Sequence, residues 1–235
     1  MKFEIDEHKF NTNWFGSRFG MSTEINLLHA DSEEVRLACS GFSVVELRVP
    51  TSETWQSWVY PNESFKEVDQ QIHYRITTKK FSKPSSNTEF VDSKTLPIET
   101  NDFSDFLAER YLRLPNMTLE KLAKRYKSWA QELMEEHPGT CGTVLYKGKP
   151  LGYIFGRVEG TKGYFTLGVT SKKSQVSGIG LYQQAFEMFH SQGAQSVYSS
   201  FSAANIGALN IHSSLGCRFV SATTIYIWIN PEQPI

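Results

Sequence analysis

The sequence predicts a mixed α/β fold, in which strands of one sheet alternate with helices along the chain. Three observations support this prediction. Short segments rich in β-branched and aromatic residues recur along the 235 residues, and several alternate between apolar and polar positions. Other segments repeat apolar residues every three to four positions, which is typical of amphipathic helices. Glycine, proline and small polar residues separate the two kinds of segment.

The first part of the chain is predicted to consist mainly of strands. Residues 42–49 are β-branched and partly alternating, and Pro50 ends this strand. Residues 68–77 alternate regularly, so one face of this strand is expected to be apolar. Between these strands, residues 51–60 begin with the capping residues of a short helix. Residues 13–20 are rich in aromatic residues and glycine, and they are predicted to form a turn between two strands.

A change of composition predicts a domain boundary. Residues 79–100 are rich in Ser, Thr, Lys and Pro, and they lack sustained apolar periodicity. We therefore expect an N-terminal domain over residues 1–80, a linker over residues 81–100 and a second domain over residues 101–235.

The second domain is expected to begin with two helices and a hairpin. Residues 101–111 carry apolar side chains at helical spacing after an Asn-Asp start signal. Residues 118–134 form a second amphipathic helix, whose first residue, a threonine, caps it. Residues 141–146 and 151–158 read as strands, and Gly148 suits the tight turn between them.

The rest of the second domain alternates strands with helices. Residues 164–169, 196–201 and 222–229 are rich in β-branched, aromatic and small residues, and they are predicted to be strands. Residues 181–191 and 205–214 are predicted to be helices, each followed by a glycine that ends it.

Composition and charge exclude several classes of protein. The chain has 24 Lys and Arg against 25 Asp and Glu, so it lacks the overall positive charge typical of nucleic-acid or membrane-surface binding. No apolar stretch approaches the roughly 20 residues of a membrane span, and the acidic N-terminus does not resemble a signal peptide. Three scattered cysteines and six histidines without ligand spacing predict neither a disulfide framework nor a metal site. We expect a cytoplasmic protein with no nucleic-acid or membrane partner.

The sharpest local motif is a glycine loop, Gln-Val-Ser-Gly-Ile-Gly, at residues 175–180. Gly178 and Gly180 lack Cβ atoms, so backbone N–H groups can approach an anion closely. The helix that follows leaves N–H groups unpaired at its partly positive end, which suits a pyrophosphate. The motif lacks the Gly-Lys-Ser/Thr of a P-loop and the three glycines of a dinucleotide fingerprint. A plain turn before an amphipathic helix is the alternative.

Two motifs in order along the chain resemble the GNAT acyltransferase superfamily, over residues 101–229. The superfamily signature, Gln/Arg-x-x-Gly-x-Gly/Ala after a strand, is matched by Gln175, Gly178 and Gly180. A later helix of the superfamily has the form Asn-x-x-Ala-x-x-x-Tyr-x-x-x-Gly, and this chain has at those positions Asn205, Ala208, His212 and Gly216. The resemblance implies the GNAT fold and an enzyme, an N-acetyltransferase that moves an acetyl group from acetyl-CoA to a primary amine.

The same resemblance implies a set of site residues. Acetyl-CoA would be the cosubstrate, with no metal, and it would contact Leu167, Gly168, Val169, Gln175, Val176, Ser177, Gly178, Ile179, Gly180, Leu181 and Asn205. The catalytic position, a proton-donating Tyr in the superfamily, is His212 here. The ordinary pKa of histidine, about 6.5, leaves three roles open: an acid, a base, or a side chain that only packs against CoA.

A further resemblance concerns the first half and the acceptor. The segment 14–16 resembles an aromatic element of TDP-fucosamine acetyltransferase-like sugar-amine acetyltransferases. The segments 41–45 and 64–68 each resemble the Gly-Phe-x-x-Val element that leads into the last strand of a GNAT core, so residues 1–80 are expected to be a partial GNAT-like domain. This resemblance places at the acceptor site Arg110, Tyr111, Tyr153 and Phe155. It implies a small-molecule amine, such as a nucleotide-linked amino sugar. Another small amine, a protein amine and a non-catalytic acyl-CoA-binding module are alternatives, and a homodimer is left open.

Overall fold

The structure is a computed structural model that describes residues 3–56, 61–83, 87–92, 98–172, 174 and 178–233. Within these residues the strands are β1 (Asp6–Glu7), β2 (Phe19–Ser22), β3 (Val44–Pro50), β4 (Lys66–Thr77), β5 (Thr88–Asp92), β6 (Gly142–Tyr146), β7 (Lys149–Glu159), β8 (Lys162–Thr170), β9 (Ser196–Ser202) and β10 (Arg218–Ile229). The α-helices are α1 (Lys9–Phe15), α2 (Ile25–His29), α3 (Ser32–Cys39), α4 (Thr51–Gln56), α5 (Leu119–Glu136), α6 (Ile179–Ser191) and α7 (Ile206–Ser214). Three short 3₁₀ helices are η1 (Thr78–Phe81), η2 (Thr100–Phe103) and η3 (Arg110–Arg113).

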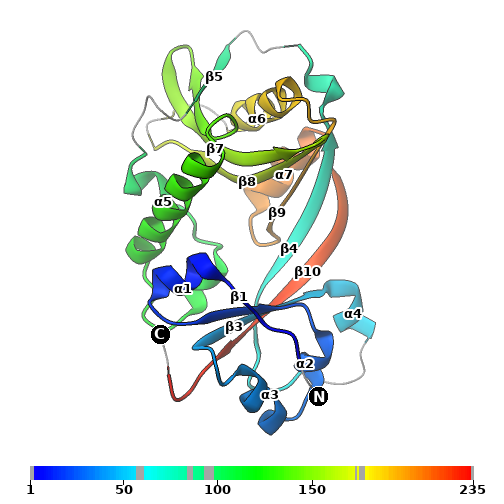
Figure 1. Cartoon of the computed structure of the whole chain (residues 1–235). Coiled ribbons are helices and arrows are strands. Elements are labelled where there is room, and N and C mark those ends of the chain that lie inside the picture. The colour runs from blue at the N-terminus through cyan, green and yellow to red at the C-terminus, as the bar shows by residue number, and fades with distance from the viewer. Residues whose placement is uncertain are drawn as a thin grey trace.

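All ten strands belong to one mixed sheet (Figure 1). Their order across the sheet is β1-β2-β3-β10-β4-β9-β8-β7-β6-β5. The pairs β2/β3 and β8/β9 are parallel, and the other neighbouring pairs are antiparallel. The predicted mixed α/β class is therefore confirmed.

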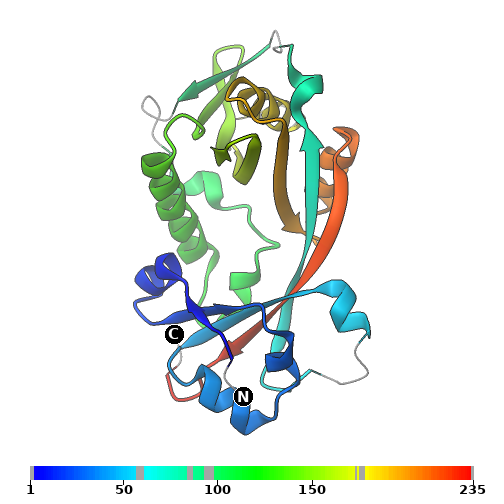
Figure 2. The ribbon, with the colours of Figure 1, turned by 45° about the vertical axis from the view of Figure 1, so that its right-hand side comes forward.

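Strand β4 joins the two halves of the chain. It comes from the N-terminal half, yet it lies between β9 and β10 from the C-terminal half. Its register places Ile72 opposite Phe201 of β9 on one side and opposite Ala222 of β10 on the other. Figures 1 and 2 show β4 and β10 as long strands that run from the upper part of the molecule into the lower part. Backbone hydrogen bonds thus build the N-terminal half into the sheet.

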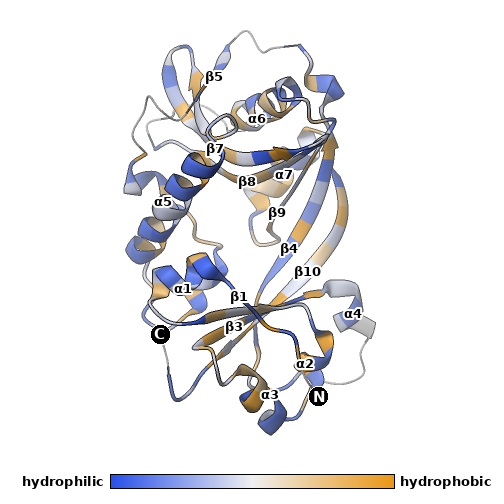
Figure 3. Ribbon diagram, in the orientation of Figure 1, coloured by the Kyte–Doolittle hydropathy of each residue, from blue (hydrophilic) through white to orange (hydrophobic). Residues whose placement is uncertain are grey.

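Helices cover the sheet and create three hydrophobic clusters. Helix α5 packs over one face, where Tyr153 and Phe155 of β7 point. Helix α6 packs over the opposite face, which Ile154 of the same strand reaches, as the alternation of a strand requires. Helices α2 and α3 cover β3 and β10 in the lower part of the molecule. Figure 3 shows mainly hydrophilic residues along α5, because this helix buries only one face.

The sequence signals at several element ends are confirmed. The hydroxyl of Thr118 accepts a hydrogen bond from the backbone N–H of Lys121 and caps α5. The β6–β7 turn places Lys147 and Gly148 at φ values of 50° and 76°, as a two-residue hairpin turn of type I′ requires. Gly193 follows the C-cap of α6 and has a φ of 87°, a conformation that glycine adopts without strain.

The turn predicted over residues 13–20 is wrong. Residues 9–15 form helix α1, which Gly16 ends in the left-handed conformation, and β2 begins at Phe19. The side chain of His8 caps the helix by accepting the N–H of Asn11. The helix escaped prediction because its asparagines and threonine have modest helix propensity, whereas the burial of Asn11 in the interior is a tertiary effect.

The helix predicted over residues 101–111 is also wrong. The segment forms η2 and η3 with irregular backbone between them. Glu99 and Asp102 make a reciprocal capping box at the start of η2, and this helix ends after a single turn. Phe103 and Tyr111 are each 1% exposed. Their apolar spacing therefore reflects burial beneath α5 and not a continuous helix.

The expected linker contributes to the sheet. Within residues 81–100, strand β5 pairs antiparallel with β6 over five residue pairs. This strand is only five residues long and lies within a polar segment, so the composition of the segment predicted a linker. The division of the chain into two domains stays a prediction. None of the described helices combines the length and the hydropathy needed to cross a membrane.

The place of β4 predicts that residues 81–235 do not fold alone. Removing residues 1–80 leaves the edges of β9 and β10 without their shared neighbour, and unpaired strand edges promote aggregation. It also takes Tyr74 and Ile76 out of the cluster under α6. We expect the fragment to be insoluble or unfolded by circular dichroism, and co-expression with residues 1–80 to restore it. A fragment that unfolds cooperatively by itself would contradict this expectation.

Candidate functional site

A cavity of about 1080 Å³ lies where β8 and β9 move apart. The two parallel strands pair only over residues 162–164 and 196–198, although both continue beyond. A β-bulge coincides with the separation, because Thr166 interrupts the register of β8 against β7. Bulges increase the local twist of a strand, which carries its far end away from a neighbour. Beyond the bulge the facing edges of β8 and β9 do not pair with each other.

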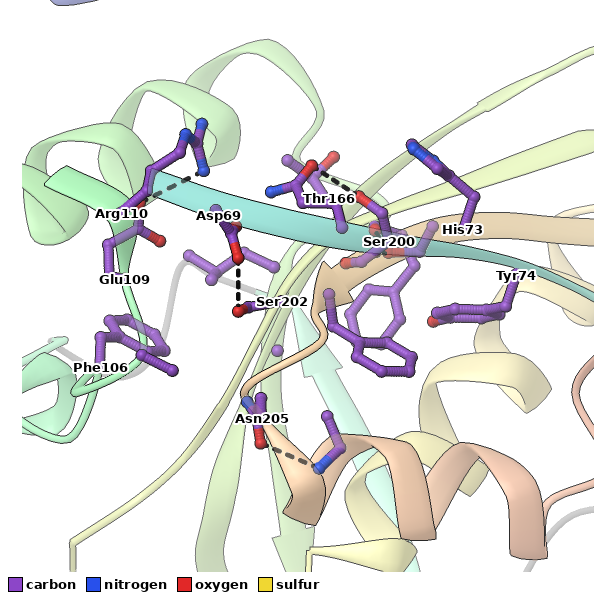
Figure 4. Close-up of a pocket in the computed structure, with 18 of the residues that line it drawn as sticks. Asp69, His73, Tyr74, Phe106, Glu109, Arg110, Thr166, Ser200, Ser202 and Asn205 are labelled. Atoms are coloured by element: carbon purple, nitrogen blue, oxygen red, sulfur yellow. Dashed lines mark hydrogen bonds and ion pairs between the residues drawn. The ribbon is translucent and has the colours of Figure 1, made fainter. Parts of the chain in front are cut away.

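The cavity receives side chains from both faces of the sheet. On the α5 face its lining includes Asp69, His73, Glu109 and Arg110. On the side of α6 and α7 it includes Tyr74, Tyr182, Asn205 and His212. Figure 4 shows Asp69, Glu109 and Arg110 on one side of the gap and Asn205, at the start of α7, on the other. The gap between β8 and β9 therefore connects two chemically different walls.

His212, the predicted catalytic residue, lines the cavity from α7. The residue is 2% exposed. Its ring lies among Tyr74, Tyr182 and Phe201, with centroid distances of 4.3, 4.7 and 4.9 Å. Nδ1 lies 2.7 Å from the carbonyl oxygen of Ala208. Nε2 is buried and makes no hydrogen bond within the described residues.

These surroundings set the protonation of His212. A carbonyl oxygen only accepts hydrogen bonds, so Nδ1 carries the proton and Nε2 has the free lone pair. Burial lowers the pKa of His212 below its ordinary value, although the hydrogen bond to Ala208 opposes this shift. At neutral pH the ring is uncharged and can accept a proton, but it is a poor proton donor. The catalytic role of His212 stays a prediction.

The residues expected to hold acetyl-CoA are partly brought together. Leu167, Gly168 and Asn205 line the cavity. The side chain of Asn205 caps α7 by accepting the N–H of Ala208 at 3.0 Å. Val169 is 3% exposed and packs in the cluster under α5, away from the cavity lining. The expected contact of Val169 with acetyl-CoA would therefore involve only its backbone.

The glycine loop leads into α6. Gln175, Val176 and Ser177 lie outside the described residues, whereas Gly178 is the N-cap of α6, and Ile179, Gly180 and Leu181 form its first turn. Gly178 has a φ of −63°, so its backbone does not require glycine. A Cβ atom at Gly178 would point toward Thr170 of β8 and Ile211 of α7. Lys172, which lies upstream of this loop, pairs with Asp105.

Arg110, a predicted acceptor residue, belongs to a buried ionic cluster. Its Nε donates to Glu46 at 3.0 Å, and one of its terminal nitrogens donates to Glu109 at 3.3 Å. Glu46 is fully buried and also accepts from Arg48 at 2.5 Å. Burial by itself raises the pKa of Glu46, but Arg110 and Arg48 outweigh it and bring the pKa to about 2. The charge of Arg110 is thus already paired with two carboxylates, those of Glu46 and Glu109.

Tyr111, another predicted acceptor residue, is held between two guanidinium groups. The guanidinium carbons of Arg110 and Arg125 lie 4.5 and 4.4 Å from the centre of its ring. Its hydroxyl accepts from Asn11 at 3.0 Å and from Arg110 at 3.3 Å. Arg110 and Tyr111 therefore line the cavity, but other groups of the protein use most of their polar atoms, and their role at an acceptor site stays a prediction.

The placement of Tyr153 and Phe155 at the acceptor site is wrong. The exposed fractions of these residues are 6% and 0%, and both belong to the core under α5. Neither is among the residues that line the cavity. Both point to the α5 face of β7, and β7 is separated from the gap by β8, so the core covers them.

Several residues that line the cavity were not predicted from the sequence, and three of them matter for its chemistry. Asp69 and Tyr74 lie on β4, and Glu109 precedes η3. Alternation along β4 predicts that Asp69 and Tyr74 lie on opposite faces of the sheet, but no local sequence signal indicates that β4 lies beside β9. The contact between Ser202 and Asp69 joins residues that are far apart in the sequence, so only the topology could reveal it.

Comparisons with known proteins place the fold in context. No family model matches the chain, and no curated protein matches it. A conserved protein of unknown function from Staphylococcus epidermidis has a TM-score of 0.54 at 14% identity, over 84% of this chain and 77% of its own. This likeness shows a shared fold.

Solved structures named as GCN5-related N-acetyltransferases are also similar to the chain. The protein from Sphaerobacter thermophilus has a TM-score of 0.49 at 16% identity, over 78% of this chain and 59% of its own. The protein from Kribbella flavida has a TM-score of 0.48 at 11% identity, over 89% of this chain and 80% of its own. The chain thus spans about three fifths of the Sphaerobacter protein.

Glu46→Gln is expected to destabilise the protein by about 3–5 kcal/mol, because removing this buried charge takes away the ion-pair partner of Arg48 and leaves Arg110 with Glu109 alone. Urea denaturation at pH 7 measures the effect. The pKa of Glu46 is lowered from 4.5 to about 2, so its stabilisation is complete above pH 4.5 and is lost as the pH falls toward 2. The variant should lack this part of the acid sensitivity. As a control, Glu33→Gln breaks the exposed pair with Arg36 and should change the free energy of unfolding little. Equal stability of wild type and Glu46→Gln would refute the stabilising role of the cluster.

Proposed function

We propose that the chain is an acyl-CoA-dependent N-acetyltransferase, which moves an acetyl group from acetyl-CoA to a primary amine. The observation that carries this proposal is the separation of β8 and β9 beyond the bulge at Thr166. An unpaired strand edge can bind the amides of an extended molecule by strand addition, and the pantetheine arm of acetyl-CoA has such amides. The cavity runs through this gap, so a thioester held there is accessible from the α5 face.

The chain offers groups for each part of such a ligand. The N-cap and first turn of α6, at Gly178 and Gly180, supply the helix N-terminus that suits a pyrophosphate. Leu167 and Gly168 line the cavity, and a backbone N–H of one of them would stabilise an oxyanion. Acetyl-CoA would supply the activated acetyl group, and the protein would supply position and a preorganised electrostatic environment.

The departing thiolate needs a proton donor, and Tyr74 suits this role better than His212. Burial raises the pKa of Tyr74 well above its ordinary value, so its hydroxyl stays protonated at neutral pH. This hydroxyl makes no hydrogen bond of normal geometry within the described residues, and its ring contacts His212. We assign to Tyr74 a hydrogen bond to the leaving sulfur. We assign to His212, held by Ala208, the positioning of that ring and of the ligand.

The alternative is a non-catalytic acyl-CoA-binding module. The presence of both a protonated donor and a cavity that opens to the α5 face favours the enzyme. The acceptor amine would enter from that face, and a nucleotide-linked amino sugar is one candidate for it. Release of CoA thiol from acetyl-CoA in the presence of an amine panel tests the proposal, and binding of acetyl-CoA without any release would support the module.

Gly178→Ala is expected to weaken acetyl-CoA binding about tenfold, or about 1.4 kcal/mol. The new Cβ would project into the space between Thr170 and Ile211, where the end of β8 meets α7. The thermal shift caused by acetyl-CoA measures binding, since a ligand stabilises the native state. Gly139→Ala is the matched control, because a Cβ there meets no atom within 4 Å. An absence of any acetyl-CoA shift in the wild type would overturn the proposed function.

Tyr74→Phe and His212→Phe are each expected to lower turnover about tenfold or more, while the acetyl-CoA thermal shift persists. Phenylalanine keeps an aromatic ring in the cluster but removes the hydroxyl or the imidazole nitrogens. Steady-state thiol release and the thermal shift, measured on the same samples, separate chemistry from binding. Unchanged turnover in His212→Phe would show that this side chain only packs against its neighbours.

A further inference from the structure

One carboxylate in the cavity lining, that of Asp69, lies beyond ion-pair distance of every cation in the described residues. Asp69 lies on β4 and lines the cavity on the α5 face. Its Oδ1 accepts a hydrogen bond from the hydroxyl of Ser202 on β9 at 2.6 Å. Figure 4 shows this carboxylate pointing toward Ser202 at the gap, beside Glu109 and Arg110. Asp69 forms no ion pair in the part of the chain that the structure describes.

The arginines that line the same cavity are already occupied. Arg48 and Arg110 pair with the buried Glu46, and Arg110 pairs also with Glu109. Arg157 pairs with Glu159 at 2.6 Å.

Arg125 also lines the cavity and has no carboxylate partner among the described residues, but its surface is almost fully covered. The residue is 4% exposed, and a terminal nitrogen donates to the side-chain oxygen of Asn11 at 2.6 Å. Its guanidinium carbon lies 4.4 to 5.9 Å from the ring centres of Phe10, Tyr111, Tyr126 and Trp129. The described lining thus has no unpaired, accessible arginine to bind a diphosphate.

The other titratable groups around Asp69 do not supply a positive charge. Burial lowers the pKa of His73, on the same strand, and that of His8, so both are neutral at pH 7. Glu109 pairs with Arg110 and also accepts from the hydroxyl of Tyr126. Apart from the covered guanidinium of Arg125, the charge on this half of the cavity that has no ion-pair partner among the described residues is therefore that of Asp69.

We infer that the acceptor is a net-cationic primary amine, whose ammonium group is bound by Asp69 and whose proton Asp69 takes up during the transfer. This inference rests on the proposed function. A nucleotide-linked amino sugar carries a diphosphate, which this charge distribution disfavours. A buried or half-buried carboxylate binds an ammonium group strongly because few water molecules compete for it.

The chemistry is balanced as follows. The bound ammonium releases one proton to solvent, and the neutral nitrogen forms a bond to the thioester carbonyl carbon while the π pair of the carbonyl moves onto oxygen. The positively charged nitrogen so formed passes its next proton to Asp69. The oxyanion then re-forms the C=O bond, the C–S bond breaks and its electron pair leaves with sulfur, and the thiolate takes up a proton from Tyr74, which regains one from solvent, to give CoA. The amine becomes an N-acetyl amide, and Asp69 returns its proton to solvent.

The environment of Asp69 suits a proton acceptor. Burial raises its pKa above the ordinary value for aspartate, although the hydrogen bond from Ser202 and the charge of Arg110 act in the opposite direction. A carboxylate with a raised pKa is a stronger base. Ser202 fixes the carboxylate at the edge of the gap, beside the unpaired edge of β8.

The test is Asp69→Asn, which keeps the shape and the acceptor oxygen for Ser202 but removes the charge. The panel consists of two polycations, 1,4-diaminobutane and spermidine, and one anionic acceptor, a UDP-linked amino sugar. We expect wild-type kcat/KM to be higher for the polycations, and Asp69→Asn to raise their KM about tenfold or more and to lower kcat. Asp69→Glu should recover part of the loss. The matched control is Asp6→Asn, an exposed aspartate on β1, which should behave as wild type.

The acetyl-CoA thermal shift separates this inference from the proposed function. If acetyl-CoA causes no shift, the proposed function fails and the inference fails with it. If the shift is present in wild type and in Asp69→Asn, the fold and CoA binding are intact and the amine data decide. A preference for the UDP-linked sugar, or unchanged KM and kcat for spermidine in Asp69→Asn, would overturn the inference. Where no amine is turned over, failure of spermidine to shift the melting temperature of the acetyl-CoA-bound wild type would also overturn it.

Discussion

The insertion of β4 between β9 and β10 is the constraint on which the rest of the structure depends. A strand in the middle of a sheet has both of its edges paired, so β4 cannot leave without exposing β9 and β10. Because its side chains alternate, the same strand supplies groups to both walls of the cavity. Asp69 and His73 face the side of α5, whereas Tyr74 faces α6 and α7. The N-terminal half is thereby a structural part of the candidate site.

A second constraint comes from the buried Glu46 on β3. A fully buried carboxylate is stable only with charged partners and hydrogen bonds, and Arg48 and Arg110 supply them. Arg110 lies at the start of η3, so this cluster fixes η3 and the preceding Glu109 over the gap. The cost of burying these charges is offset inside the cluster, and little positive charge is left for a ligand. Ionic interactions that stabilise the fold therefore also determine which charges the cavity presents.

The sequence predicted elements that depend on local chemistry and missed those that depend on distant contacts. Thr118 and Asn205 cap α5 and α7 by hydrogen bonds to residues three positions away, so their signal is local. The hairpin at Gly148 follows from the backbone conformation that its turn requires. By contrast, the apolar spacing in residues 101–111 came from burial under α5, and two 3₁₀ turns satisfy it as well as a helix does. The partners of β4 lie more than a hundred residues away, and alternation fixes only which way each side chain points.

The contrast between the two cavity walls explains why an amine would approach from one side only. Around His212 the wall consists of Tyr74, Tyr182 and Phe201, and the imidazole itself is neutral. Moving an ammonium group into such surroundings costs several kcal/mol, because no carboxylate replaces its water. The same apolar wall strengthens the interaction of a backbone N–H with a developing oxyanion, since electrostatic interactions grow as water is excluded. On the α5 face, Asp69 replaces part of the lost hydration of a cation. A cationic acceptor is therefore stabilised up to the gap and not beyond it, which leaves the amine beside the unpaired edge of β8, where a thioester carbonyl would lie.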